Sequence, residues 1–242
     1  MHRLFCLLAL AACTRDEPAR TVVIVSANAE WKAVRAVYPD ARVDTTPWGE
    51  FFVEPKTGAI LFHGGWGKVA AAGSAQYAID RWNPRTVVNL GTAGGFAGRI
   101  AKGAVVLADK TVIYDIKEAM GDSAEAIADY ATTINLDWLS TPYPTPVTKT
   151  LLVSGDRDLV PGELAELVTK YGAVAGDWES GAIAYTCARN HRRVLILRGI
   201  TDVVSASGDV VYGDLAAFQA GADKVMRQLL ADLPAWLARL PG

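Results

Sequence analysis

Thr86-Val-Val-Asn-Leu-Gly-Thr-Ala-Gly-Gly95 is a short β-branched run followed at once by a glycine-rich segment. β-Branched residues favour strands, and an apolar run of this length before glycines predicts a buried strand that opens into a loop. On its amino-terminal side, an alanine-rich segment from about Val69 to Trp82 predicts a helix that Asn83-Pro84 ends. A helix followed by a buried strand is the repeating unit of a layered α/β fold.

The same alternation continues in both directions along the chain. Thr21–Val25 predicts another buried strand, and Phe51–Val53 with Ala59–Phe62 predicts a hairpin. Further strands are expected at 105–107, 112–114, 151–153 and 194–197, and further helices over 161–171, 181–190 and 214 to about 240. We therefore expect one α/β domain over residues 21–242, with three α/β/α layers around a mixed, mostly parallel, twisted sheet.

Four segments follow expected strands at their carboxyl ends, which is where ligands bind in open α/β sheets. They are Ser26–Glu30, Gly91–Gly95, Ser154–Asp158 and Gly199–Asp202, the last containing an expected turn at Thr201-Asp202. The sequence thus predicts a site at this edge of the sheet. A long helix closes the chain, with Pro234 as its candidate break.

The composition favours a small-molecule ligand. With 24 basic and 26 acidic residues the net charge is only -2, so no overall field attracts nucleic acid or an anionic membrane surface. No metal-site spacing is visible, because His2, His63 and His191 are scattered and the cysteines are not paired. We expect no metal and no cofactor.

The first residues predict an exported, lipid-anchored protein. Arg3 precedes an apolar run over residues 4–12, and Leu10-Ala-Ala-Cys13 resembles a bacterial lipobox, in which cleavage occurs before Cys13 and its thiol is acylated. Residues 1–20 would then be a signal peptide and a short tether, with the mature domain on the periplasmic side of the cell envelope. The alternatives are a plain secretory leader or a misassigned start before a cytosolic domain.

Carboxylates follow several of the expected strands, at Glu30, Asp156, Asp158, Glu179 and Asp202. Such groups suit glycosidic cleavage, because one acid can protonate the leaving group while one base activates water. The glycine-rich turns match neither the phosphate loop nor the dinucleotide fingerprint, and no Gly-x-Ser-x-Gly elbow indicates a serine hydrolase.

The order of the motifs resembles the 5'-methylthioadenosine/S-adenosylhomocysteine nucleosidases of the purine nucleoside phosphorylase superfamily. The resemblance covers nearly everything after Thr21. Six segments in the family order carry it: Ser26–Glu30, Gly65-Trp-Gly-Lys-Val-Ala-Ala-Ala72, Asn89–Gly95, Ser154-Gly-Asp156, Trp178-Glu179 and Arg198–Asp202. It implies a nucleoside phosphorylase-like fold and hydrolysis of the N-glycosidic bond of a purine nucleoside, adenosine-type and conceivably 5'-thio-substituted.

The resemblance implies roles for the acidic residues. Asp202 matches the general acid that protonates the purine's five-membered ring, a role that needs a carboxyl group keeping its proton near neutral pH, as partial burial allows. Glu179 matches the glutamate that accepts hydrogen bonds from the ribose hydroxyls and stabilises positive charge on the sugar. The alternatives are a helix-capping aspartate and a surface glutamate at a helix start.

The same resemblance supplies the water-activating group. Glu30 matches the glutamate that polarises the attacking water, and Arg198 the arginine that orients this carboxylate; the alternative for Arg198 is a solvated arginine at a strand end. Thr92 matches a hydroxyl residue on the ribose side, or else forms a turn. Gly94 belongs to the same substrate-lining segment.

The choice between hydrolysis and phosphorolysis rests on charge. A phosphorylase must bind a phosphate dianion, for which arginine is the usual residue. The superfamily's phosphorylases carry an arginine where this chain has Asn89 and a basic residue where it has Glu30. Both differences remove positive charge, so the nucleosidase interpretation follows.

The base and tail positions depart from the family pattern. Asp158 stands where the family has an aromatic residue against adenine, so adenine preference does not follow, while Leu159 still offers its backbone to the base. Trp178 replaces a methionine and Trp66 an aliphatic residue, and Tyr212 falls where an aromatic residue covers the sugar and tail. Core packing is the alternative for all three aromatic side chains.

Three functions are therefore compared. The first is a nucleosidase acting on a small nucleoside, without nucleic-acid partners and with membrane contact only through its anchor. The second is a phosphate-dependent nucleoside phosphorylase. The third is a lipid-anchored nucleoside-binding protein without catalysis. The presence of Glu30, Glu179 and Asp202 is evidence against this alternative. The resemblance further implies a homodimer.

Overall fold

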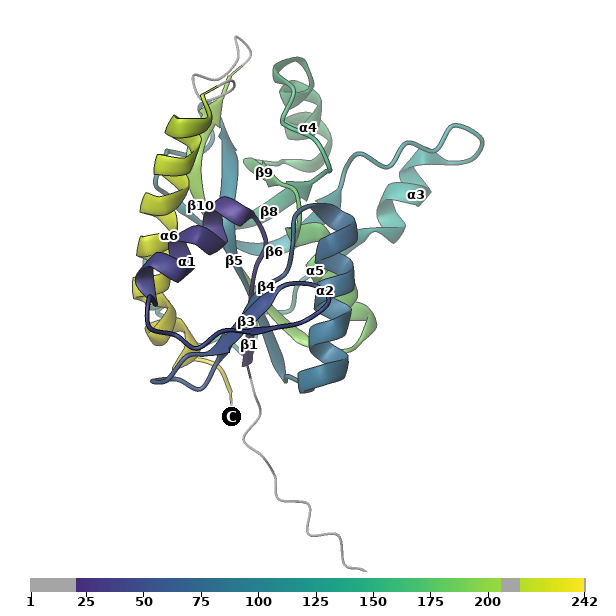
Figure 1. Ribbon diagram of the computed structural model, residues 1–242. Helices are drawn as coiled ribbons and strands as arrows, with labels where there is room; N and C mark the ends of the chain where they lie inside the picture. Colours follow the sequence, from purple (N-terminus) through teal and green to yellow (C-terminus); the bar gives the residue numbers. More distant parts are fainter. Residues whose placement is uncertain (1–20, 206–213, 242) are drawn as a thin grey trace, which may run out of the picture.

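The computed structural model describes residues 21–205 and 214–241. The expected leader 1–20 with Cys13, and Tyr212, lie outside these residues. Within the described part, the predicted α/β architecture with a mixed sheet is confirmed. Figure 1 shows the sheet between two helical layers, with α1 (Asn28–Val37) and α6 (Leu215–Leu237) on one side and α2 (Gly67–Trp82) and α5 (Ser180–Arg189) on the other.

Strand β5 (Thr86–Phe96) lies at the centre of the sheet. Its first half pairs in parallel with β1 (Thr21–Val25) on one side and with β10 (Arg193–Val204) on the other. β1 continues to β4 (Ile60–His63), which forms the predicted antiparallel hairpin with β3 (Glu50–Val53). All but the first residue of β1 are buried, which explains its unbroken apolar sequence.

A second set of strands closes into a ring on the other half of β5. The ring runs from β5 through β9 (Ala175–Asp177), β8 (Thr148–Ser154) and β6 (Val105–Ile113) to β10, which pairs with β5 again. The longest pairings, β10 with β5 and β6 with β8, are parallel. The remaining elements are β2 (Asp44–Thr45), α3 (Ser123–Asp129), β7 (Ala131–Thr133), the short 3-10 helix Pro161–Glu163 and α4 (Leu164–Tyr171).

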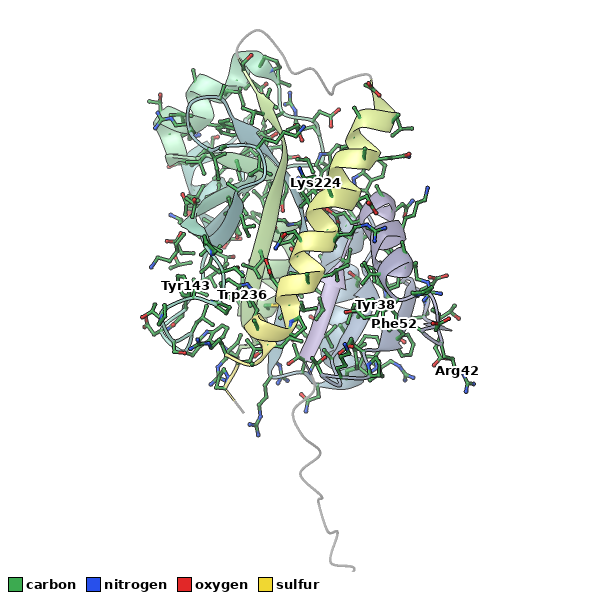
Figure 2. The ribbon with its side chains drawn as sticks, turned by 90° about the vertical axis from the view of Figure 1, so that its left-hand side faces the viewer. Tyr38, Arg42, Phe52, Tyr143, Lys224 and Trp236 are labelled. Atoms are coloured by element: carbon green, nitrogen blue, oxygen red, sulfur yellow. The ribbon has the colours of Figure 1, made fainter. Side chains whose placement is uncertain are left out.

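Helix α6 crosses β10 and packs beside α1, as Figure 2 shows. The expected break at Pro234 is wrong, since the helix includes this residue and ends at Leu237. The fully buried Trp236 stacks on Tyr143 with ring centroids 5.8 Å apart, which fixes the last turn against the body of the protein (Figure 2). The proline therefore costs one hydrogen bond close to a helix end that packing already holds.

Two segments that the sequence predicted to be loops are parts of β-strands in the structure. Residues 91–95 continue β5 and residues 199–202 continue β10, in place of the expected turn. The glycines are needed for close approach between strands, because a Cβ at Gly95 would lie 2.8 Å from Ile100 Cγ2 and 2.9 Å from Ile200 Cγ2. The pairing shifts between Ile200 and Asp202, so that Thr201 is the extra residue of a bulge.

Helix α1 was not expected, since residues 26–30 were assigned to a loop. The loop consists of Ser26 and Ala27 only, and the helix begins at Asn28. Trp31 and Val34 lie on its buried face. This early start matters for the site, because it places Glu30 in the first helical turn, directly after β1.

Candidate active site

A cavity of about 540 Å³ opens at the carboxyl ends of β1, β5 and β10. The four segments that the sequence placed at this edge all contribute to it or contact its walls. Nine predicted site residues line the cavity, namely Glu30, Trp66, Thr92, Gly94, Asp158, Leu159, Trp178, Glu179 and Asp202. Arg198 lies directly behind the lining, and Tyr212 is outside the described residues.

Glu30 is held in a fixed position by backbone and side-chain donors. Its Oε1 accepts hydrogen bonds from Thr92 N at 2.6 Å and Thr92 Oγ1 at 2.9 Å, and its Oε2 accepts one from Ala27 N at 3.1 Å. The last bond caps the first turn of α1. Glu30 is only 1% exposed but lines the cavity, so a small ligand can reach it. Thr92 is a strand residue rather than a turn former.

Arg198 is fully buried on β10, so its interpretation as a solvated arginine is wrong. Its guanidinium lies among three carboxylates. Nη1 is 3.6 Å from Glu30 Oε1, Nε is 2.8 Å from Asp177 Oδ2, and Nη2 is 3.5 Å from Glu179 Oε2. Burial acts to lower the pKa of Arg198, but these carboxylates raise it by more. The guanidinium is therefore a fixed cation beneath the cavity floor.

Neutral groups complete the surroundings of Arg198. Nη2 donates to Asn89 Oδ1 at 2.8 Å, and Asn89 in turn donates through Nδ2 to the Ile24 carbonyl at 3.1 Å. Asn89 thus supports the arginine from inside the sheet. Gly91 is required beside it, because a Cβ there would lie 2.0 Å from Arg198 Nη1.

Glu179 is the N-cap residue of α5 and is buried, so it is not a surface glutamate, and its side chain makes no capping hydrogen bond to the helix. Its Oε1 accepts a hydrogen bond from Gly67 N at 3.2 Å, which ties it to the start of α2. The pKa of Glu179 is raised to about 8 by burial, together with the charges of Glu30 and Asp177, against the lowering influence of Arg198. One guanidinium among three carboxylates leaves Glu179 as a group that holds a proton near neutral pH.

The proton on Glu179 predicts how the stability of the ligand-free protein depends on pH. Between the ordinary pKa of 4.5 and the folded-state value of about 8, the folded protein holds a proton that the unfolded chain has lost. The free energy of unfolding should therefore fall as the pH rises through this window. Urea unfolding at pH 5.5 and pH 7.5 measures the difference, and Glu179→Gln should reduce it. An equal pH dependence in the variant would refute the assignment.

Asp202 enters the cavity through the bulge in β10. It pairs with Gly94, and a Cβ at Gly94 would lie 3.4 Å from Asp202 Oδ2 and 3.0 Å from Leu159 Cδ1. Thr201 donates its hydroxyl to Asp202 Oδ1. Asp202 is a strand residue, so the helix-capping alternative is wrong.

Glu30 of α1 and Asp202 of β10 both lie beside strand β5. Glu30 is bonded to Thr92 and Asp202 lies over Gly94, two residues further along β5. Both residues line the same cavity, so a ligand in it can contact both carboxyl groups.

Aromatic and apolar side chains form the remaining wall. Trp66 and Trp178 stack with ring centroids 5.1 Å apart, and both line the cavity, so core packing does not account for them. Trp66 is 62% exposed. Leu215 and Phe218 of α6 line the same cavity. The wall offers an apolar surface to a ligand whose polar atoms face the carboxylates.

Sequence reasoning missed several of the site's residues. Asp177 lines the cavity and pairs with Arg198, and Ser180 bonds to both. The signal for Asp177 was its position next to Trp178-Glu179, but it is the last residue of a three-residue strand that is too short to be recognised in the sequence. Leu215 and Phe218 were assigned to the closing helix without a role at its start. In the described part of the chain, no cluster of His, Cys, Asp and Glu has the arrangement of a metal site.

A family model described as "Phosphorylase superfamily" matches residues 20–233. Among curated proteins, a 5'-methylthioadenosine/S-adenosylhomocysteine nucleosidase of Thermotoga maritima is 33% identical over 60% of this chain and 65% of its own length. The chain thus aligns with slightly less than two thirds of that relative. The nucleosidase of the same name from Marinomonas is 27% identical over 85% of this chain and 95% of its own length.

Solved structures share the fold. A Helicobacter pylori 5'-methylthioadenosine/S-adenosylhomocysteine nucleosidase, with butyl-thio-DADMe-Immucillin-A, superposes with a TM-score of 0.74. Its sequence is 17% identical, and the superposition covers 93% of this chain and all of that one. The Neisseria meningitidis protein of the same name gives a TM-score of 0.70 at 21% identity, over 91% and 98% of the two chains. These likenesses confirm the nucleoside phosphorylase-like fold.

Proposed function

Because the chain belongs to the phosphorylase superfamily, we propose that it is a nucleosidase that hydrolyses the N-glycosidic bond of a purine nucleoside. The observation that carries the proposal is the presence of Glu30, held by Thr92 of β5, and Asp202, beside Gly94 of β5, in one cavity that also holds Glu179. This arrangement provides a base, an acid and a hydrogen-bonding carboxyl group for the sugar.

In the proposed reaction, Asp202 donates a proton to the departing purine. The electron pair of the bond between the sugar's C1' and the base moves to the base, which leaves as a neutral molecule. Positive charge then develops on the sugar ring. Glu179 hydrogen-bonds with the ribose hydroxyls, and in the fraction of molecules in which it is ionised its negative charge also stabilises that developing charge.

Glu30 activates the water on the other side of the sugar. Its carboxylate takes one proton as the water oxygen bonds to C1'. Thr92 and Ala27 fix the carboxylate, and Arg198 at 3.6 Å balances part of its charge from below. The water is thus held close to the carbon without a mobile side chain, which reduces the entropic part of the barrier.

The charges around the cavity favour water over phosphate. Six acidic residues line it, namely Glu30, Asp158, Asp177, Glu179, Asp202 and Asp214, of which only Glu179 and the general acid Asp202 are assigned a proton before the reaction. Arg157 is the one basic side chain among the described lining residues, and its Nη2 is already 3.2 Å from Glu163 Oε1. A phosphate dianion would be repelled here. Asn89 cannot bind the phosphate in place of an arginine, because its side-chain oxygen accepts from Arg198 and its side-chain nitrogen donates to the Ile24 carbonyl.

The proposed substrate is an adenosine-type nucleoside with an apolar 5'-thio substituent. The relatives are named for nucleosides with an adenine base and a 5'-thioether, which supports both parts of this proposal. The apolar wall of Trp66, Leu215 and Phe218 could contact an apolar substituent. Asp158 lines the base end and favours bases that present N–H donors. A panel must therefore include 6-oxopurine nucleosides beside adenosine and 5'-methylthioadenosine.

The test incubates the domain 21–242 with this panel, with and without inorganic phosphate, and identifies the sugar product. The proposal predicts free sugar and free base in phosphate-free buffer, at a rate that phosphate does not increase. Sugar 1-phosphate formed only when phosphate is added would instead identify a phosphorylase. Binding without release of the base would identify a non-catalytic nucleoside-binding protein.

We further propose that the mature protein is anchored in the bacterial cell envelope through a lipid on Cys13. The lipobox-like Leu10-Ala-Ala-Cys13 supports this location, and no helix among residues 21–205 and 214–241 is suited to crossing a bilayer. The full chain, expressed in a bacterium, should fractionate with membranes. Cys13→Ala should shift it to the soluble or unprocessed fraction, whereas Cys187→Ala, a buried cysteine, should not. Incorporation of labelled fatty acid into Cys13→Ala to the same extent as into the parent would rule out this anchor.

We also propose that the protein is a homodimer, an arrangement supported by the family resemblance. Sedimentation of the domain 21–242 at micromolar concentration should give twice the mass of the chain. A monomer at the concentration used for the activity assay, with full activity, would refute the dimer as the working form.

A further inference from the structure

The carboxylate of Asp177 is held by hydrogen bonds and an ion pair with three neighbouring residues, Ser154, Ser180 and Arg198. Its Oδ1 accepts a hydrogen bond from Ser154 Oγ at 2.6 Å, and its Oδ2 accepts one from Ser180 Oγ and lies 2.8 Å from Arg198 Nε. The Ser180 backbone N–H donates to both oxygens, at 3.3 and 3.2 Å. The side chain of Asp177 is only 1% exposed, and the residue borders the cavity. It is therefore a rigid anion at the wall of the active site.

The three guanidinium nitrogens of Arg198 point in three directions, and Asp177 contacts Nε, the nitrogen nearest to the backbone. Nε contacts Asp177 and donates to Ser180 Oγ at 2.9 Å. With Nε fixed, the plane of the guanidinium is fixed, because all its N–H bonds lie in one plane. Nη1 is then directed to Glu30, and Nη2 to Glu179.

We infer that Asp177 is a positioning residue for the reaction: its carboxylate fixes Arg198 so that one cation serves both the water-activating Glu30 and the sugar-binding Glu179. The inference rests on the proposed function for its catalytic part. It assigns to Asp177 and Ser180 a role in orientation, since neither residue needs to touch the reacting atoms. Ser154 supports Asp177 from the side opposite to Arg198.

The charge of Asp177 also affects the protonation of Glu179. The charged groups that act on Glu179 are Arg198 from β10, Glu30 from α1 and Asp177 from β9, and a backbone N–H of α2 donates to it. The pKa of Glu179 is raised to about 8 chiefly by burial, and the charges of Glu30 and Asp177 contribute to this rise. Removing the charge of Asp177 must therefore make Glu179 lose its proton at lower pH.

The first test uses Asp177→Asn, in which the amide oxygen can still accept from Arg198 Nε. Carboxyl carbon NMR of the ligand-free domain, with labelled glutamate and the Glu179→Gln variant to assign the signal, follows the titration of Glu179. The inference predicts that its midpoint falls by about one pH unit in Asp177→Asn. An unchanged midpoint would overturn the electrostatic part, whether or not any nucleoside is cleaved.

The second test uses Ser180→Ala, which preserves every charge and removes one of the two contacts of Arg198 Nε. We expect kcat to fall by about 10-fold, with KM changed less than about threefold and the Glu179 midpoint unmoved. For Asp177→Asn, the expected loss of kcat is about 10- to 100-fold. The matched control is Ser74→Ala, a buried serine of α2 that donates to the Ala71 carbonyl.

The outcomes separate this inference from the proposed function. If the parent domain cleaves no nucleoside, the proposed function fails, and the NMR titration still decides whether Asp177 controls Glu179. If the parent is active and Ser180→Ala keeps its kcat, the positioning role is refuted, even where Asp177→Asn does not fold. Thermal unfolding of each variant identifies a loss of activity that comes from misfolding.

Discussion

Asp202→Asn is expected to lower kcat for purine nucleosides by about 10³-fold, while the affinity for a non-hydrolysable nucleoside analogue changes by less than about threefold. The amide keeps the size of the side chain and its place over Gly94, and Thr201 can still donate to its oxygen. It has no acidic proton to give to the departing base. Initial rates and calorimetric titration of the analogue measure the two quantities.

The control for this experiment is Asp80→Asn, an exposed aspartate of α2 that hydrogen-bonds with Gln76 outside the cavity. It should leave kcat and affinity unchanged. A kcat for Asp202→Asn within threefold of the parent would remove Asp202 from the mechanism. If the affinity for the analogue fell by the same factor as kcat, Asp202 would instead contribute mainly to binding the substrate in its ground state.

Glu30→Gln is the second substitution with a large expected effect, again a loss of about 10³-fold in kcat. The amide oxygen can accept from Thr92 as the carboxylate does, while the amide nitrogen cannot accept the bond from Ala27 N, so thermal unfolding of the variant must show that the fold is kept. The amide cannot take a proton from water. Single-turnover rates with the best substrate of the panel measure the chemical step, separately from product release.

Glu166→Gln, an exposed glutamate of α4, is the matched control for Glu30→Gln. It should show parent activity. If Glu30→Gln instead retained activity that grew with added phosphate, the carboxylate would act mainly to exclude anions, and its role as a base would be refuted.

Much of the sheet was predictable because its strands are continuous apolar runs. Thr21–Val25 was placed at its observed bounds, and the hairpin was identified from two apolar runs separated by Pro55 and Gly58. A strand buried on both faces needs no polar alternation, and short β-branched runs reveal it. The same holds for the helix that ends before Asn83, where the backbone has a left-handed conformation.

The glycine-rich segments could not be assigned from local sequence. Glycine usually marks a turn, yet Gly94 and Gly95 lie inside β5, because side chains of neighbouring elements occupy the space that a Cβ would need. The bulge at Thr201 depends on the same long-range packing. Such positions are set by contacts between segments far apart in the chain, which no local pattern contains.

The site residues were predictable to the extent that a family resemblance could order them. Glu30, Glu179 and Asp202 converge as that resemblance implied. Asp177 was missed because it neither ends a recognisable strand nor belongs to a familiar motif. Its importance is visible only from its contacts with Arg198 and Ser180, which come from different elements.

The most direct test of the account is a single turnover in water labelled with ¹⁸O, in phosphate-free buffer, followed by mass spectrometry of the sugar. The account predicts one labelled oxygen at C1' in the first product molecule, with the rate lowered in Glu30→Gln and Asp202→Asn. Release of the base only after phosphate is added, with the sugar recovered as its 1-phosphate, would contradict it.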